Sequence, residues 1–215
     1  MIIVLFGAPG SGKGTQAANI TEKYKDVYHL SVGDAFRALV KTESELAKTV
    51  KSYIDRGALV PVEIVIEVVR DSLLKNKDRY NHFILDGFPR SVEQCEAFKE
   101  IASELKQDYV VLTIDVPDEV IIGRLTKRVS CAKCGYILNE DIKKCPKCGS
   151  EEFTKRKDDS REVISDRLNL YHNICKEVIG YFDQNKLFII DGNCDINIIK
   201  EKLFELLETK VFKGK

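Results

Sequence analysis

The chain has 215 residues, 44% of them hydrophobic, and its 34 basic residues are balanced by 34 acidic ones. This length favours one folded core with insertions over two independent folds. The balanced charge gives no sign of a polyanion-binding surface or a polybasic membrane anchor, and the opening apolar run is too short for a secretory signal or a membrane span. We therefore expect a soluble, cytoplasmic protein with no nucleic-acid or membrane partner.

Short apolar runs predict strands that alternate with helical patterns. Strands are expected at 2–6, 28–30, 82–85, 109–115 and 187–190, and helices over 91–105, 118–126, 160–182 and 196–207, where apolar residues recur at helical spacing. Ser91 and Asp118 stand where N-caps are expected. Because continuously apolar strands are buried on both faces, the pattern predicts an α/β fold: a parallel sheet with helices on both faces.

The first strand runs directly into Gly-Ala-Pro-Gly-Ser-Gly-Lys-Gly-Thr, residues 7–15. A glycine-rich turn between strand and helix lets backbone N–H groups converge on a phosphate, and Lys13 adds a full positive charge. The general P-loop pattern has Ser or Thr directly after the lysine, whereas here Gly14 precedes Thr15. A plain βα turn with an incidental lysine is the competing interpretation, and four glycines around Lys13 count against it. The loop is interpreted as a nucleotide-polyphosphate site.

Residues 129–159 break the strand–helix alternation. Two Cys-x-x-Cys-Gly knuckles, separated by ten residues, contribute Cys131, Cys134, Cys145 and Cys148. This spacing is typical of a structural Zn²⁺ with four thiolate ligands, and a metal-free or disulfide-bonded segment is the alternative. Metal binding would supply the folding energy of so polar a segment, on the order of 10 kcal/mol. The other three cysteines, Cys95, Cys175 and Cys194, are interpreted as small apolar residues.

The loop sequence resembles the P-loop of adenylate kinases and their nucleoside-monophosphate kinase relatives. Further motifs similar to this family's follow in its order at 30–37, 57–61, 86–94, 123–128, 155–168 and 191–193. The resemblance implies a P-loop NTPase-type core (1–30, 61–127 and 160–215), a small helical nucleoside-monophosphate-binding domain (31–60) and a zinc-binding lid (128–159). The stretch between the two cysteine pairs is shorter than in the usual zinc lid of this family.

The same resemblance assigns the site residues. It implies an ATP site formed by Gly10, Ser11, Gly12, Lys13, Gly14, Thr15, Arg124, Arg128 and Cys194. It implies an AMP site formed by Val32, Arg37, Leu59, Val60, Gly87, Arg90, Gln94, Arg156 and Arg167. The catalytic set is Lys13, Arg90, Arg124, Arg156 and Arg167, and Asp86 is expected to bind Mg²⁺ through water.

This set of residues also makes chemical sense without the resemblance. Two nucleotides bring together phosphate oxygens that repel one another unless cations separate them, and the planar guanidinium fork meets two such oxygens at once. Direct phosphoryl transfer needs positioning and charge neutralisation rather than a covalent nucleophile. Asp34 is expected to cap a helix, and His29, His82 and His172 are interpreted as structural. For Asp158 and Asp159, pairing with arginines and a purely structural role are both open.

The implied reaction is Mg²⁺-dependent: ATP and AMP give two ADP, reversibly, on a monomer. Gln94 favours AMP, because its amide both donates to and accepts from an adenine edge. Val32 stands where adenylate kinases usually have threonine, so a UMP/CMP-type kinase is the alternative.

A nucleic-acid-linked NTPase with a zinc ribbon would need excess positive charge around the knuckles, and lysines and acidic residues balance there. A degenerate nucleotide-binding protein would not need to retain Lys13, the arginines and Asp86.

Overall fold

A five-stranded parallel sheet forms the centre of the computed structural model, which describes residues 1–42, 44–55, 58–139 and 141–212. Its order is β2-β3-β1-β4-β8, and all neighbours pair in parallel. The strands are β1 (Ile2–Phe6), β2 (Val27–Ser31), β3 (His82–Asp86), β4 (Tyr109–Asp115) and β8 (Leu187–Asp191). The predicted parallel α/β sheet is confirmed, with β2, β3 and β8 slightly longer than expected.

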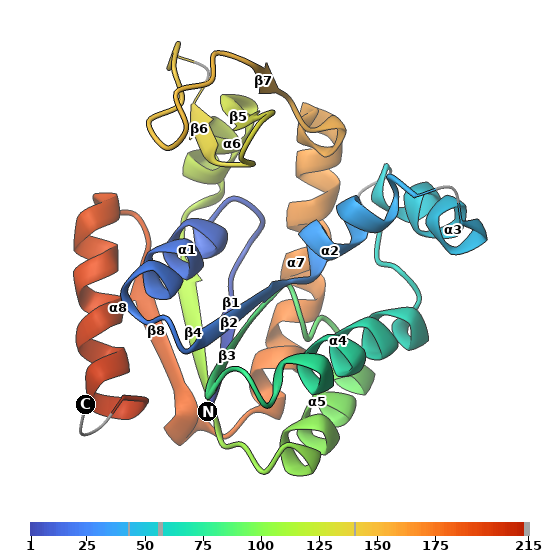
Figure 1. The fold of residues 1–215 in the computed structure, drawn as a ribbon, viewed down its shortest axis with the longest axis vertical. Coiled ribbons are helices and arrows are strands. Elements are labelled where there is room, and N and C mark those ends of the chain that lie inside the picture. The colour runs from blue at the N-terminus through green and yellow to red at the C-terminus, as the bar shows by residue number, and fades with distance from the viewer. Residues whose placement is uncertain (43, 56–57, 140, 213–215) are drawn as a thin grey trace.

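Helices cover both faces of this sheet (Figure 1). Alternate residues of β1 point to opposite sides, so Val4 joins one apolar core and Leu5 the other. The first core is packed by α4 (Val62–Asn76), α5 (Val92–Glu104) and the C-terminal part of α7 (Arg161–Tyr181). The second is packed by α1 (Lys13–Lys23), α6 (Asp118–Thr126), the N-terminal part of α7 and α8 (Ile196–Lys210). Burial on both faces explains why β1 is apolar throughout.

The helix starts follow the sequence expectations in part. Ser91 caps α5 by accepting a hydrogen bond from the Gln94 amide, as predicted. The prediction that Asp118 caps α6 is wrong. Pro117 occupies the N-cap position, and the Asp118 carboxylate lies 2.9 Å from Nε2 of His172 instead. The Asp118 carboxylate therefore contacts a histidine on α7, which is distant in the sequence, instead of capping its own helix.

Two short helices follow β2 and project away from the sheet (Figure 1): α2 (Val32–Leu39) and α3 (Glu45–Ile54). Ser31 caps α2, accepting from the amide of Asp34 at 3.3 Å. The expectation that Asp34 is itself the cap is therefore wrong, because the serine three residues earlier takes that position. Gly57, which opens the expected motif at 57–61, lies outside the described residues.

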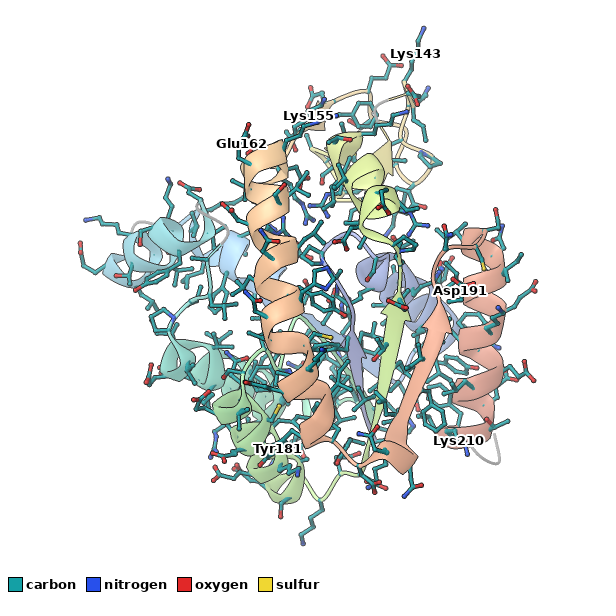
Figure 2. The ribbon with its side chains drawn as sticks, turned by 180° about the vertical axis from the view of Figure 1, so that it is seen from behind. Lys143, Lys155, Glu162, Tyr181, Asp191 and Lys210 are labelled. Carbon is teal, nitrogen blue, oxygen red and sulfur yellow. The ribbon has the colours of Figure 1, made fainter. Side chains whose placement is uncertain are left out.

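A separate antiparallel sheet lies between α6 and α7. Its strands are β5 (Arg128–Cys131), β6 (Ile137–Asn139) and β7 (Phe153–Thr154), in the order β6-β5-β7. A short 3₁₀ helix, Lys157–Asp159, leads into α7, and a second, Gln184–Lys186, precedes β8. Figure 2 shows α7 running from Glu162 beside this small sheet to Tyr181 at the opposite end of the molecule. Within the described part of the chain, no helix is long and apolar enough to span a membrane.

Candidate active site

The glycine-rich loop lies between the carboxyl end of β1 and the start of α1. Gly12 takes a left-handed conformation (φ 101°) at the N-cap of α1 and offers no side-chain cap, so the first N–H groups of the helix are available to an anion. A Cβ atom at Gly7 would lie 2.6 Å from the carbonyl oxygen of Ile114, so only glycine fits there. Lys13 Nζ donates to the carbonyl oxygens of Gly7 (2.8 Å) and Ala8 (2.9 Å). Burial lowers the pKa of Lys13 to about 8.

A cavity of about 510 Å³ extends from this loop to the small antiparallel sheet. All residues predicted to bind ATP line it: Gly10, Ser11, Gly12, Lys13, Gly14, Thr15, Arg124, Arg128 and Cys194. Asp86 also lines it, as do five of the residues predicted for AMP: Arg37, Gly87, Arg90, Arg156 and Arg167. The chain thus brings its distant motifs to one place, where the six motif arginines and Lys13 surround the same space.

Carboxylates hold two of these arginines in defined orientations. Arg128 makes two hydrogen bonds to Asp159, of 2.8 Å from Nε and 2.5 Å from Nη2. Arg167 Nη1 donates to both the side chain and the backbone carbonyl of Asp158, each at 3.0 Å. Of the two interpretations left open for these aspartates, the structure favours pairing with arginines. The bidentate geometry of Arg128 fixes its guanidinium plane before any anion binds, whereas Arg167 is held through Nη1 alone.

Asp34 lies between two further arginines. Its Oδ1 accepts from Arg37 Nη2 at 2.6 Å and from Arg156 Nη2 at 3.5 Å. Burial alone would raise the pKa of Asp34, but the two arginines outweigh it and lower that pKa. The cations are also buried. Burial lowers the pKa of Arg167 to about 10, although the nearby negative charge of Asp158 raises that pKa in part. A site in which cations outnumber carboxylates is suited to a polyanion.

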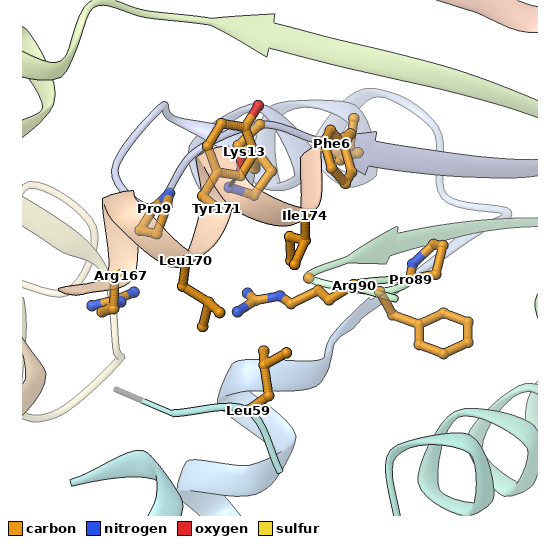
Figure 3. A pocket seen from close by; sticks show the side chains of 14 residues that line it. Phe6, Pro9, Lys13, Leu59, Pro89, Arg90, Arg167, Leu170, Tyr171 and Ile174 are labelled. Atoms are coloured by element: carbon orange, nitrogen blue, oxygen red, sulfur yellow. Dashed lines mark hydrogen bonds between the residues drawn. The ribbon is translucent and has the colours of Figure 1, made fainter. Parts of the chain in front are cut away.

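An apolar pocket adjoins the charged cavity (Figure 3). Leu170, Tyr171 and Ile174 of α7 line one side, and Leu59 and Phe88 line another. Lys13, Gly87, Arg90 and Arg167 contribute to the lining as well, and Figure 3 shows the guanidinium of Arg90 between Leu59 and Leu170. The pocket therefore has apolar walls with cationic groups beside them. These groups suit a nucleoside beside its phosphate, but the pocket has a volume of only about 40 Å³ in this structure and would have to widen to admit one.

The four knuckle cysteines come together in the small sheet. Their Sγ atoms all lie within 4.8 Å of one another, with Cys131–Cys148 at 3.5 Å and Cys134–Cys145 at 3.6 Å. A tetrahedral ion with bonds to sulfur of about 2.3 Å requires S–S distances of roughly 3.8 Å, so the cluster fits such an ion. The backbone N–H groups of Cys134 and Lys133 lower the pKa of the Cys131 thiol, which favours the thiolate that a metal needs.

The adenylate kinase family model matches residues 5–187, a stretch that contains every motif described above except the last one, at 191–193. The chain belongs to the adenylate kinase family. Over 189 residues it is 43% identical to an adenylate kinase of Lachnoclostridium phytofermentans, covering 85% of this chain and 86% of the relative. An adenylate kinase of Caldicellulosiruptor bescii is 42% identical (88% and 90% covered), and one of Clostridium tetani 40% identical (96% and 98%).

Membership in the adenylate kinase family confirms the resemblance inferred from the motifs. It also makes the chain a phosphotransferase of the nucleoside-monophosphate kinase type. Some residues predicted for AMP do not reach the cavities: Val32, Val60 and Gln94 are buried and line neither of them. Gln94 Oε1 accepts a 2.7 Å hydrogen bond from the Arg90 amide, so the side-chain amide presents Nε2 as its donor.

The motifs of the adenylate kinase family did not reveal every lining residue. Tyr136, Ile137, Leu138, Ile142 and Pro146 face the larger cavity from the small sheet. Tyr136 and Ile142 are also large apolar side chains with more than a third of their surface exposed, 38% and 39%. Their place beside the knuckles was the only signal available in the sequence. Tyr171 and Ile174 lie in the apolar pattern that predicts the helix over 160–182, and periodicity does not distinguish a core position from a pocket wall.

Proposed function

We propose that this member of the adenylate kinase family transfers the γ-phosphoryl group of ATP to AMP, reversibly and with Mg²⁺, to give two ADP. One observation carries the proposal: the P-loop and six arginines from separate segments surround a single cavity of about 510 Å³, with an apolar pocket beside it. Two nucleotides whose phosphates meet need this combination of one charged centre and separate nucleoside sites. The relatives named adenylate kinases support the choice of AMP as the acceptor.

The donor phosphates bind, in this proposal, on the P-loop side of the cavity. Residues 10–15, Arg124, Arg128 and Cys194 hold ATP there, and Lys13 exchanges its loop carbonyls for phosphate oxygens. The acceptor phosphate lies against Arg37 and Arg90, while Arg156 and Arg167 stand between the two nucleotides. An arginine that neutralises the transferring group contributes roughly 10³–10⁵ in rate. The acceptor oxygen attacks the γ-phosphorus directly, so no covalent enzyme intermediate forms.

The acceptor nucleoside binds, in this proposal, at the apolar pocket, which widens from its volume of about 40 Å³ to admit the nucleoside. Leu59 and Phe88 supply apolar contacts for a base, and Val32, Val60 and Gln94 support this side from beneath. Because the oxygen of Gln94 is engaged by the Arg90 amide, its Nε2 is the group offered to a base, and a ring nitrogen of adenine accepts such a donor. A pyrimidine carbonyl or ring nitrogen accepts the same donor, so the choice of AMP rests on the relatives named adenylate kinases.

Two metal ions belong to the proposal. Asp86 ends β3 beside Gly14, where a carboxylate facing the cavity suits Mg²⁺ held through water. When it is bound, the ion neutralises charge on the donor phosphates.

Zn²⁺ is proposed for Cys131, Cys134, Cys145 and Cys148, because four thiolates at tetrahedral spacing leave no open coordination position. Its role is therefore structural.

The proposed domain division assigns residues 31–60 to a monophosphate-binding domain, 128–159 to a lid, and 1–30, 61–127 and 160–215 to the core. Arg124 and Arg128 precede the zinc knuckles and Arg156 follows them. A lid that closes as one body would bring these charges onto the nucleotides and exclude water that competes for the γ-phosphate. One chain supplies every proposed site residue, so a monomer suffices.

Phosphoryl transfer from Mg·ATP to AMP, UMP, CMP and GMP, measured in parallel on zinc-loaded protein, tests the proposal. We expect a strong preference for AMP, and a loss of at least roughly 10³-fold in the Lys13→Met variant. A preference for UMP or CMP would place the enzyme in a neighbouring branch and make Val32 the informative residue. Absence of transfer to all four acceptors would overturn the proposal.

A further inference from the structure

Arg124 is held by a different kind of partner from most of the cations around the cavity. Four of the six motif arginines lie against carboxylates: Arg37 and Arg156 against Asp34, Arg128 against Asp159, and Arg167 against Asp158. Arg124 Nη2 instead donates a 3.0 Å hydrogen bond to the backbone carbonyl oxygen of Gly192, and no carboxylate in the described part of the chain forms an ion pair with it. A neutral acceptor orients a guanidinium group without cancelling its charge.

The backbone around Gly192 is itself held in place at the carboxyl end of the parallel sheet. The N–H group of Gly192 donates to the carbonyl oxygen of Asp115 at 2.7 Å, directly after the point where Asp115 stands opposite Asp191 in the pair of β4 and β8. On the other side, the amide of Asn193 donates to Oδ1 of Asp191 at 2.8 Å. Hydrogen bonds before and after the Gly192 carbonyl therefore fix its position.

The space around Gly192 admits no side chain. A Cβ atom there would lie 2.5 Å from Cγ2 of Val116, 2.6 Å from Cγ2 of Ile114 and 3.0 Å from the carbonyl oxygen of Asp115. Unbonded carbon atoms prefer separations of about 3.5–4.0 Å. Val116 and Ile114 are buried in the second apolar core, where close packing resists displacement. A larger residue would therefore push the loop, with its carbonyl oxygen, away from Arg124.

The loop that contains Gly192 places two residues of the predicted ATP site. Arg124 and Cys194 both line the larger cavity, and Cys194 Sγ donates to Oδ2 of Asp191 at 3.3 Å. Gly192 itself is buried and lines neither cavity. A guanidinium group has five N–H donors, so the bond from Nη2 to the carbonyl leaves the others free to meet a ligand.

We propose that Gly192 is a positioning residue for the donor nucleotide: its backbone carbonyl fixes the guanidinium plane of Arg124 toward the cavity and leaves the positive charge of that group uncompensated. This rests on the proposed function, in which Arg124 binds ATP. Gly192 touches no nucleotide and acts through the arginine alone. Glycine is needed because only a residue without Cβ brings its carbonyl oxygen so close to the end of β4.

A double-mutant cycle separates positioning from a general structural role. Binding of Mg·ATP and of AMP to the full-length, zinc-loaded protein is measured by calorimetry. In Gly192→Ala we expect ATP affinity to fall roughly tenfold, as for the loss of one hydrogen bond to a charged group, and AMP affinity to stay unchanged. In the Arg124→Ala background, the same glycine substitution should cause no further loss of ATP affinity, because the group it positions is gone.

Gly180→Ala is the matched control. It replaces a glycine of α7 at which a Cβ atom meets nothing within 4 Å, and it should bind both nucleotides like the wild type. Unchanged ATP affinity in Gly192→Ala would overturn the inference. So would a loss of equal size with and without Arg124, or an equal loss of AMP affinity, because each of these indicates a structural role only.

A second measurement decides the matter if Gly192→Ala does not fold. Nitrogen-15 nuclear magnetic resonance of the nucleotide-free wild type follows rotation of the guanidinium groups, and the Arg124 signals are those missing from Arg124→Lys. We expect slower rotation about the Nε–Cζ bond of Arg124 than of the exposed Arg161, and equal rates would refute the inference. Failure of the proposed function has a different signature: the wild-type protein itself would then transfer no phosphate to AMP.

Discussion

Lys13 is the residue at which burial and function conflict most clearly. It lies against its own loop, bonded to the carbonyl oxygens of Gly7 and Ala8. Burial lowers its pKa to about 8, although the nearby Asp86 opposes that shift. The pKa of an exposed lysine is about 10.4. In the nucleotide-free protein the Lys13 ammonium group therefore loses its proton at a pH roughly two units lower than an exposed lysine does. A bound triphosphate would favour the charged form and raise the pKa again.

We therefore predict that ATP affinity falls as pH rises above 8, by about tenfold per pH unit up to pH 10, because binding must then take up a proton. Over the same range the nucleotide-free protein should gain stability, because the unfolded chain holds the proton that the folded one has lost. Calorimetric titration with ATP between pH 7 and 10 measures the first effect. Lys13→Arg, which keeps its charge, should flatten the profile, and a flat wild-type profile would contradict the account.

At the residue scale, the sequence motifs predicted which side chains line the cavity. They were less informative about the hydrogen-bond partners that hold those side chains in place. The loop residues and arginines lie within short local patterns, so their identity is readable from the sequence. Asp34 shows the limit: Ser31 and Asp34 are both competent caps, and only the fold shows that Asp34 contacts Arg37 and Arg156.

At the element scale, the central strands were predictable and those of the small sheet were not. β1 is an apolar run of five residues, and β4 has seven residues of which only Thr113 and Asp115 are polar. β6 and β7 have three and two residues, too few for an alternation to be recognised. The buried cluster of this sheet comprises Val129, Leu138 and two of the cysteines. We expect so small a cluster to need the proposed metal to hold the sheet together.

Removal of zinc should therefore unfold the small sheet and leave the parallel core intact. Turnover should fall by at least roughly tenfold, because Arg124, Arg128 and Arg156 flank the knuckles and lose their common placement. Zinc release is quantified with a chromogenic chelator, turnover in the same sample, and helix content by circular dichroism. Cys134→Ser should behave like the chelated protein. Unchanged turnover after verified loss of zinc would show that the lid does not need the metal.

At the scale of the whole molecule, a chain with no net charge gathers six arginines and Lys13 around one cavity. Contacts between distant segments assemble that cavity: Arg156 lies 3.5 Å from Asp34, and Arg37 lies 4.0 Å from Asp158. Each pair joins the helix after β2 to the segment that leads out of the small sheet. These pairs are more than a hundred residues apart in the sequence, so local patterns do not reveal them. They bring the two proposed substrate-binding regions together over the phosphate site.

The central claim is direct transfer between two nucleotides held on one molecule. Phosphorus-31 nuclear magnetic resonance of the zinc-loaded protein, supplied only with ADP and Mg²⁺, tests it most directly. We predict that ADP converts to ATP and AMP in equal amounts, with no inorganic phosphate released, and that ATP plus AMP reaches the same mixture from the other side. Release of inorganic phosphate from ATP, at a rate that does not depend on AMP, would contradict the account and indicate an ATPase.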